Sequence, residues 1–249
     1  DCQVLWNVVT NSDANALSVQ WSDRNILDNN TASSLGGVGI WVSDSDHNII
    51  SDDRASGQTG IDISTASHGN LVRGCNATGN FYGIYLYQAP QNTIRDCEAR
   101  GPDTAISIND CSNNIVSGCK AYGSNYGIRL NTGSWNTFSN NTVLGCTGSG
   151  IALSYSTDNN TIQGNILNGN NGGISLAGSV LNWIIDNVLT GSTASGISLG
   201  ESSNSNMLES NDIAGGAGSI GIRIDTCTNC FVNGNNISGC QEGRISRPG

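Results

Sequence analysis

Apolar residues recur along the chain at a nearly constant interval. A tetrad that reads Gly-Ile-x-Leu, with some replacements, returns every 21–25 residues. Apolar and polar positions alternate within each tetrad, and this period of two predicts a short strand with one buried face. The Ile of the tetrad stands at Ile40, Ile61, Ile84, Ile106, Ile128, Ile151, Ile174, Ile197 and Ile222.

A second motif follows each tetrad in the same register. An Asn stands eight or nine residues after the Ile, an apolar residue two positions later, and an Asn, Asp or Cys five positions later. Gly, Asn, Ser and Asp lie between the motifs and predict the corners of a coil. The first Asn of the motif is Asn25, Asn48, Asn70, Asn92, Asn114, Asn136, Asn160, Asn182 and Asn206.

A repeat of this length is typical of one turn of a β-solenoid, in which each coil buries its apolar face only against its neighbours. We therefore predict an all-β protein of about eleven coils of 21–25 residues. It forms a single domain over residues 1–249 and carries no capping helix. We expect the stacked Asn side chains to form ladders, because neighbouring strands of a sheet lie about 4.8 Å apart.

Composition and charge narrow the choice of partner. Hydrophobic residues make up 37% of the chain, and twenty acidic against ten basic residues leave a net charge of −10. This charge repels nucleic-acid phosphates and anionic lipid. No apolar run approaches the roughly 18–20 residues of a membrane span. We therefore expect neither a nucleic-acid partner nor membrane insertion.

The repeated Gly-Ile-x-Leu and Asn-x-Ile-x-x-Asn/Cys pattern resembles the parallel β-helix repeat of NosD-type and related carbohydrate-active or surface proteins. The resemblance covers residues 2–245 and implies a right-handed parallel β-helix. It implies no single function, because lyases, epimerases, tailspikes and cell-surface proteins share this coil. NosD-type proteins are associated with copper, whose sites favour His, Met or clustered Cys. The chain holds only His47, His68 and Met207 for this purpose, so we expect no copper, no other metal and no cofactor.

Nine cysteines are an odd number, so at least one thiol is unpaired or pairs between chains. Cys75, Cys97 and Cys119 share one column in three successive coils, where parallel side-chain vectors fit the geometry of a disulfide poorly. We expect these three to be buried free thiols. Cys227 and Cys230 form a C-x-x-C pair, but no second pair stands at the spacing of a zinc site.

One group of charged residues fits a carbohydrate-active enzyme. The resemblance implies basic and acidic side chains that act on an acidic polysaccharide. Arg73 and Arg95 share an outward column in adjacent coils and are able to flank one anionic sugar, with Asp52 and Asp96 near them. The alternative, which we favour, is a set of solvated charges between stacked turns.

Aromatic residues make up only 6% of the chain, yet several of them cluster. Trp41 and Tyr85 share the outward position of the tetrad strand, two coils apart, and Tyr87 follows on the same strand as Tyr85. Flat rings on a rigid sheet are able to stack on a glycan or on a protein partner. The alternative is a set of ordinary surface aromatic residues.

The two ends of the sequence carry complementary halves of a coil. The chain opens on the second half of one coil and closes, at residues 243–246, on the first half of another. Unpaired strand edges are templates for another chain. We therefore predict that subunits stack head to tail into a filament, through an interface of Cys2, Val4, Val9, Cys240, Gly243 and Ile245.

These observations together favour a structural or assembly protein, not an enzyme, at the cell surface or outside the cell. An acidic surface rich in Asn, Ser and Thr, with a single lysine, resembles the surface-layer and sheath proteins of archaea and bacteria. The even coil spacing leaves no insertion long enough to build the wall of a cleft. The alternative is a polysaccharide lyase, an epimerase or a carbohydrate-binding β-helix that recognises surface glycans.

Overall fold

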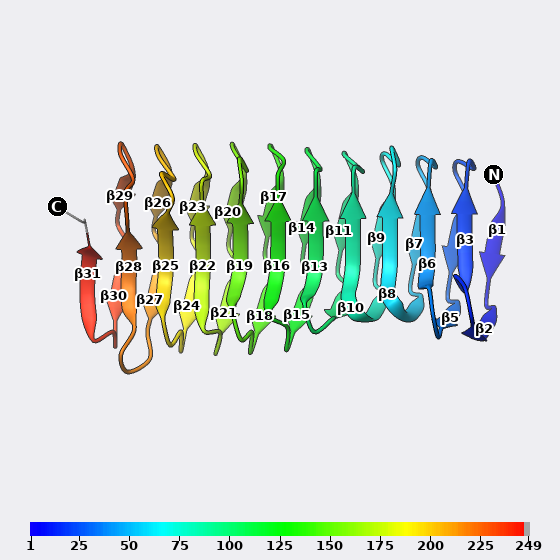
Figure 1. Cartoon of the computed structure of the whole chain (residues 1–249), viewed down its shortest axis with the longest axis horizontal. Coiled ribbons are helices and arrows are strands. Elements are labelled where there is room, and N and C mark those ends of the chain that lie inside the picture. The colour runs from blue at the N-terminus through cyan, green and yellow to red at the C-terminus, as the bar shows by residue number, and fades with distance from the viewer. Residues whose placement is uncertain (247–249) are drawn as a thin grey trace.

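The computed structural model of the chain describes residues 1–246, and the side chains of residues 1–241. Within this range the chain forms 31 strands and no helix. Successive coils stack along one axis with the ends of the chain far apart (Figure 1), and strands of neighbouring coils pair in parallel. The predicted all-β parallel β-helix is confirmed.

One sheet, called sheet A here, takes one short strand from each of eleven coils. Each strand begins directly after the Asn or the equivalent residue of the second motif. Its strands are β1 (Gln3–Leu5), β4 (Ile26–Asp28), β7 (Ile49–Ser51), β9 (Leu71–Arg73), β11 (Thr93–Arg95), β14 (Ile115–Ser117), β17 (Thr137–Ser139), β20 (Thr161–Gln163), β23 (Trp183–Ile185), β26 (Met207–Glu209) and β29 (Phe231–Asn233).

Sheet B takes up the rest of each coil, first a short strand and then the tetrad strand. The short strands are β2 (Val8–Ser12), β5 (Thr31–Ser34), β12 (Glu98–Arg100), β15 (Lys120–Tyr122), β18 (Thr142–Leu144), β21 (Ile166–Asn168), β24 (Val188–Thr190), β27 (Asp212–Ala214) and β30 (Asn236–Ser238). The tetrad strands are β3 (Leu17–Gln20), β6 (Val38–Ser43), β13 (Thr104–Asn109), β16 (Tyr126–Asn131), β19 (Ser149–Ser154), β22 (Gly172–Ala177), β25 (Ser195–Gly200), β28 (Ile220–Ile224) and β31 (Glu242–Ser246). In two coils the two strands are continuous, as β8 (Arg54–Ser64) and β10 (Asn76–Tyr87).

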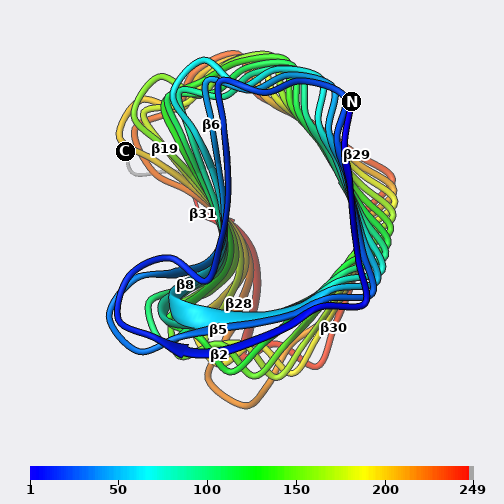
Figure 2. The same ribbon diagram turned by 90° about the vertical axis from the view of Figure 1, so that its right-hand side faces the viewer.

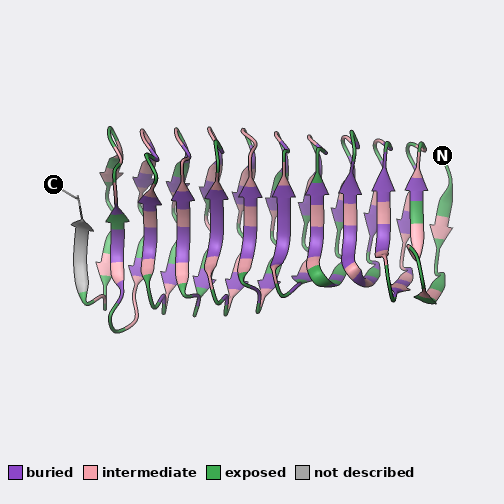
Figure 3. Ribbon diagram, viewed as in Figure 1, coloured by how far each residue is buried: buried purple, intermediate pink, exposed green. Residues whose placement is uncertain are grey.

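The core is a stack of apolar columns inside the coil. All nine Ile residues of the tetrad are at most 1% exposed, and they follow one another in register from strand to strand. Buried positions form continuous bands across the long strands (Figure 3). The Gly before the Ile is required by close packing, because a Cβ at Gly196 would lie 2.4 Å from Cγ2 of Ile213.

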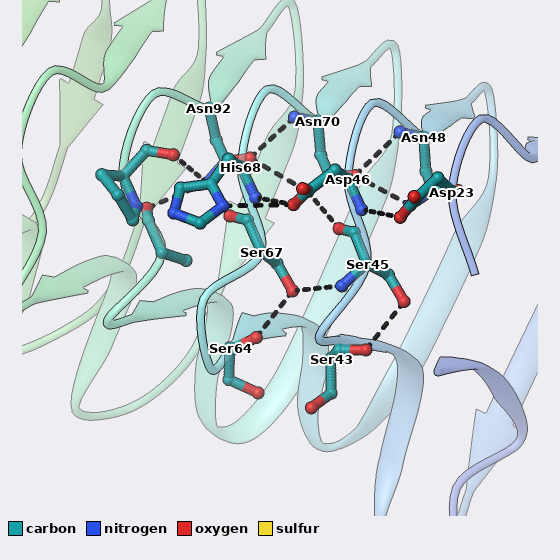
Figure 4. A network of polar contacts seen from close by, with 12 residues as sticks. Asp23, Ser43, Ser45, Asp46, Asn48, Ser64, Ser67, His68, Asn70 and Asn92 are labelled. Atoms are coloured by element: carbon teal, nitrogen blue, oxygen red, sulfur yellow. Dashed lines mark hydrogen bonds and ion pairs between the residues drawn. The ribbon is translucent and has the colours of Figure 1, made fainter. Parts of the chain in front are cut away.

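The Asn column forms the ladder that the sequence predicts. The Asn48 main-chain N–H and the Asn48 side-chain amide both donate to Oδ1 of Asn70, at 2.8 and 3.0 Å. Asn70 repeats these two bonds to Asn92 (Figure 4). Each of these side chains is at most 1% exposed. The ladder supplies partners to corner groups that would otherwise be buried without any.

A second ladder, five residues further along, contains one carboxylate. Asn30 donates its amide to the main-chain oxygen of Val4 at 2.8 Å and to Oδ1 of Asp53 at 3.0 Å. By register the matching acceptor for residue 53 is the Leu27 carbonyl. A carboxylate has no hydrogen to donate there, and Oδ2 of Asp53 is buried without a partner. Burial raises the pKa of Asp53 to about 6.

Three cysteines replace Asn in the middle of the second ladder. Cys75, Cys97 and Cys119 are free thiols and 1% exposed each, as the sequence predicts. The Cys75 thiol donates weakly to the Ile50 carbonyl at 3.5 Å, which is the bond that an Asn amide makes elsewhere in this column. All nine cysteines of the chain are free thiols.

We expect Ile128→Ala to lower the free energy of unfolding by about 2–5 kcal/mol, because Ile128 is fully buried and truncation leaves a cavity between coils. The matched control is Ile115→Ala on the outer side of sheet A, where the side chain is 44% exposed and little is lost. Urea unfolding measures both. Equal losses would contradict the assignment of inner and outer faces.

We expect Asp53→Asn to stabilise the protein at pH 8 and to leave its stability unchanged near pH 4. The folded state raises the pKa of Asp53 to about 6, against about 3.9 in an unfolded chain. The folded state therefore holds the proton more tightly, and stability falls as the pH rises through 6. At about 1.4 kcal/mol per pKa unit, the gain at pH 8 is on the order of 3 kcal/mol.

Urea unfolding of parent and Asp53→Asn proteins between pH 4 and 8 tests this prediction. The difference between the two proteins isolates Asp53 from the other titrating groups. A difference that does not change with pH would show that folding does not raise the pKa of Asp53.

Candidate functional site

The outer side of the tetrad strands forms one long surface, which we call the concave face. In the view along the axis the ribbon is indented along these strands (Figure 2). Its central row runs in register across nine coils, one residue from each strand. The residues of this row are Trp41, Asp62, Tyr85, Ser107, Arg129, Ala152, Ser175, Ser198 and Arg223.

The second half of the concave face is an open trough of about 440 Å³. Its floor consists of small residues of β19, β22 and β25, among them Ser175 and Ser198. Tyr126 borders the trough on one coil, and Glu201, Arg223 and Asp225 line it further along the axis. The even coil spacing, which leaves no inserted wall, thus does not exclude an open hollow on this face. The hollow needs no inserted loop, because a bent coil with small outward residues suffices.

The first half of the concave face is crowded with aromatic rings. The rings of Tyr82 and Tyr85 stack at 4.9 Å between centroids, and those of Tyr85 and Tyr87 are parallel at 6.3 Å. Trp41 donates its indole N–H to Oγ of Ser64 in the next coil at 3.0 Å. The structure therefore gathers the predicted Tyr85 and Tyr87 with Tyr82, and it places Trp41 on the same face.

Asp62 lies in the central row between Trp41 and Tyr85. Its Oδ1 is buried and has no hydrogen-bond partner. Burial raises the pKa of Asp62 to about 6, partly offset by a hydrogen bond from Ser64. A carboxyl with a pKa near neutrality is suited to general acid–base chemistry. The sequence gives no sign of this role, because Asp62 is there only one outward residue between Trp41 and Tyr85.

A chain of side-chain amides leads from Tyr85 along the axis through the next two coils. Asn131 donates to Oδ1 of Asn109 at 2.7 Å, and Asn109 donates to the Tyr85 hydroxyl oxygen at 3.2 Å. Burial raises the pKa of Tyr85, so its phenol keeps a proton to donate. The Arg129 guanidinium lies 4.7 Å from the centre of the Tyr126 ring, and its buried Nε has no partner.

The charged group singled out in the sequence lies elsewhere. Arg73 and Arg95 are neighbours on the outer side of sheet A, both exposed. Asp52 and Asp96 occupy the corners after β7 and β11 with φ of 54° and 55°. Among the residues that the structure describes, none of the four forms an ion pair. Their role in catalysis stays a prediction that the geometry does not favour over the concave face.

The residues expected at a junction between subunits lie at opposite ends of the solenoid. Cys2 is exposed, Val4 is half-buried beside β4, and Cys240 is half-buried. Gly243 and Ile245 belong to β31, whose side chains lie outside the described part. Head-to-tail stacking through these residues and Val9 stays a prediction.

Comparison with known proteins places the chain in a family. The profile of NosD, described as a periplasmic copper-binding protein, matches residues 1–74 and 70–246. The chain belongs to the NosD family. The resemblance seen in the sequence is thereby confirmed. No curated protein matches this NosD-family chain significantly.

Solved structures with a similar fold include an epimerase, a tailspike and a polygalacturonase. The periplasmic alginate epimerase AlgG superposes with a TM-score of 0.70 at 18% identity, over 88% of this chain and 62% of the epimerase. The Dettilon tailspike protein superposes with a TM-score of 0.72 at 15% identity, over 96% of this chain and 61% of the tailspike. Endopolygalacturonase I from Stereum purpureum superposes with a TM-score of 0.65 at 13% identity, over 99% of this chain and 94% of the polygalacturonase. At these identities the likeness shows the fold alone.

The donor set of this NosD-family chain does not fit copper. Among the described residues no group of three or more His, Cys, Asp or Glu side chains is placed to hold a metal ion. The His68 ring lies 3.2 Å from Asp46 (Figure 4), with one further histidine, His47, in the preceding coil. A hydrogen bond with the Cys97 thiol, together with burial, raises the pKa of Cys75, whereas copper binds thiolates.

Two further observations concern the position of Met207 and the search for a membrane-spanning helix. Met207 lies on the outer side of sheet A between Trp183 and Phe231. Within residues 1–246 we find no helix with the length and apolar character needed to cross a bilayer.

We expect the Asp62 carboxyl to titrate near pH 6, well above an ordinary aspartate, because burial disfavours its ionised form. Carbon-13 NMR of the side-chain carboxyls over pH 3–8 measures this, and Asp62→Asn identifies the signal by removing it. An Asp62 signal that titrates near pH 4 would contradict the buried environment.

Proposed function

We propose that the concave face binds a linear acidic polysaccharide, with the trough as the main binding site. The trough carries this proposal, because it runs along the axis and presents an equivalent set of small residues from each coil. Coils lie about 4.8 Å apart, close to the length of one hexose unit, so successive sugars meet equivalent groups. The fold shared with an alginate epimerase and a polygalacturonase supports a carbohydrate ligand over a purely structural role.

The arginines of the concave face indicate the charge of this ligand. Arg223 is already neutralised by Asp225, whose Oδ2 lies 2.5 Å from its Nε. Arg129 forms no ion pair with any residue that the structure describes. A planar guanidinium with free donors is suited to a sugar carboxylate. We therefore assign Arg129 the role of binding one uronate unit.

This function fits a protein that works outside the cytoplasm. Polysaccharides of this kind are extracytoplasmic, and the NosD family is described as periplasmic. The acidic surface, with a net charge of −10, repels a polyanionic chain everywhere except near the arginines. Binding of such a chain on the concave face therefore depends on local positive charge, which Arg129 supplies.

Ser198→Trp is the sharpest test of the trough. The indole fills the floor at a half-buried position, and we expect it to abolish binding to uronate oligosaccharides in calorimetry or on a glycan array. The matched control is Ser139→Trp, a half-buried serine on the outer side of sheet A. Equal binding by both variants, or no binding of any uronate glycan by the parent, would refute the proposal.

A second candidate function is catalysis on the same glycan by Asp62. The observation that favours it is a carboxyl with an unpartnered oxygen and a pKa raised to about 6, beside the Tyr85 phenol. Two proton-transferring groups on one face are what a lyase or an epimerase needs. Asp62 acts as base in its ionised form, so activity rises with pH through 6.

Mass spectrometry of uronate polysaccharides incubated with the protein separates binding from catalysis. We expect Asp62→Asn to remove turnover and to retain binding, because Asp62 lies three coils from Arg129. An epimerase changes neither the length nor the mass of the glycan in ordinary water, so the incubation is also run in D2O. Glycan that is neither shortened nor labelled with deuterium after prolonged incubation with the parent would leave a binding protein and refute catalysis. Product from Asp62→Asn at the parent rate would refute the role of Asp62.

A further inference from the structure

One corner position of the coil carries two unexpectedly bulky residues. The position lies directly before the Asn ladder and is left-handed in all ten coils where it is seen, with φ between 54° and 64°. Gly, Asn and other small or polar residues adopt this conformation at least cost. The residues at this position are Arg24, His47, Gly69, Gln91, Asn113, Trp135, Asn159, Leu181, Ser205 and Asn229.

Trp135 and Leu181 are costly choices here, since bulky side chains crowd the main chain in the left-handed region. Neither gains compensation from burial, because Trp135 is 63% exposed and Leu181 is 48% exposed. Two strained apolar residues that face solvent, two coils apart, point to a function that selects them. The core does not require them.

Together with Trp183, these residues surround a hollow of about 340 Å³. Trp183 begins β23 and is 53% exposed. Asn159 and Thr161 of the coil between them line the hollow as well. Because β17, β20 and β23 are consecutive neighbours in sheet A (Figure 1), the outer two coils stand about 9.6 Å apart. That width holds one ring between apolar walls.

The chemistry of the lining defines the occupant. No charged side chain lines the hollow, so a charged ligand gains nothing here. Among the residues that the structure describes, the side chains of Asn159 and Thr161 form no hydrogen bond with the protein, and both are available to a ligand. A pyranose ring has apolar faces for indole rings and hydroxyls at its edge for an amide and a hydroxyl.

We propose that Trp135, Leu181 and Trp183 form a binding site for one neutral pyranose unit of a glycan. The ring lies between the walls, and its edge hydroxyls bond to Asn159 and Thr161. This site is on a different sheet from the trough and differs from it in charge preference. It does not depend on the function proposed for the concave face.

Tryptophan fluorescence and calorimetry with neutral oligosaccharides test the site, using β-1,4-linked glucose, xylose and mannose oligomers. We expect the parent to bind at least one of them with a fluorescence change. Trp183→Ala and Trp135→Asn each weaken binding at least about fivefold, as loss of ring contact predicts. Trp21→Ala is the control, since Trp21 is 80% exposed and lies five coils from Trp135.

A second variant separates the site from a merely structural feature. Leu181→Asn relaxes the left-handed corner, so its melting temperature rises while its sugar affinity falls. Ser198→Trp, which blocks the trough, leaves neutral-sugar binding unchanged. Absence of binding to every neutral oligomer, or binding that survives both Trp variants, would overturn the proposal. So would concentration-dependent self-association of the parent that Trp183→Ala abolishes, since the hollow would then hold a second copy.

Discussion

The hydrogen bonding of each coil to the next at a spacing of about 4.8 Å governs this molecule. Because the spacing is constant, every position of the coil becomes a column, and most inward columns repeat residues of one kind. The Ile columns satisfy this by dispersion and burial, and the Asn ladder by main-chain and side-chain bonds to each Oδ1. Asp53 differs from the Asn residues of the second ladder. The neighbouring coil cannot move away to let water reach its unpartnered Oδ2.

The inner half of this architecture is predictable from sequence because the columns repeat. Ile128 and Asn70 are identifiable as buried from their register alone, and the structure agrees. The outer half is not, because solvent imposes no repeat on outward positions. Ser175 and Ser198 read as unremarkable serines until the bend of the coil makes them the floor of a trough. Asp62 was visible in the outward column, but its buried oxygen depends on neighbouring coils that no motif describes.

The description of the family as copper-binding and the side chains of this chain suggest different ligands. The NosD profile matches residues 1–74 and 70–246 of the chain. The described residues hold no cluster of metal-binding side chains, and the thiols nearest to one another lie in the core. Family membership therefore accounts for the fold, whereas the function that we propose rests on a few outward side chains that vary from coil to coil.

Because the central row of the concave face is in register, its residues are spaced by whole multiples of the distance between coils. Asp62 and Arg129 are separated by a whole number of coils, so the distance between them changes only in steps of one coil. Duplication or loss of a coil preserves the core, since each column merely gains or loses one member. If the coil lies between Asp62 and Arg129, the same event changes the distance between the carboxyl and the guanidinium by about the length of one sugar unit. A protein of this kind is able to alter which unit of a chain it addresses without redesigning either group.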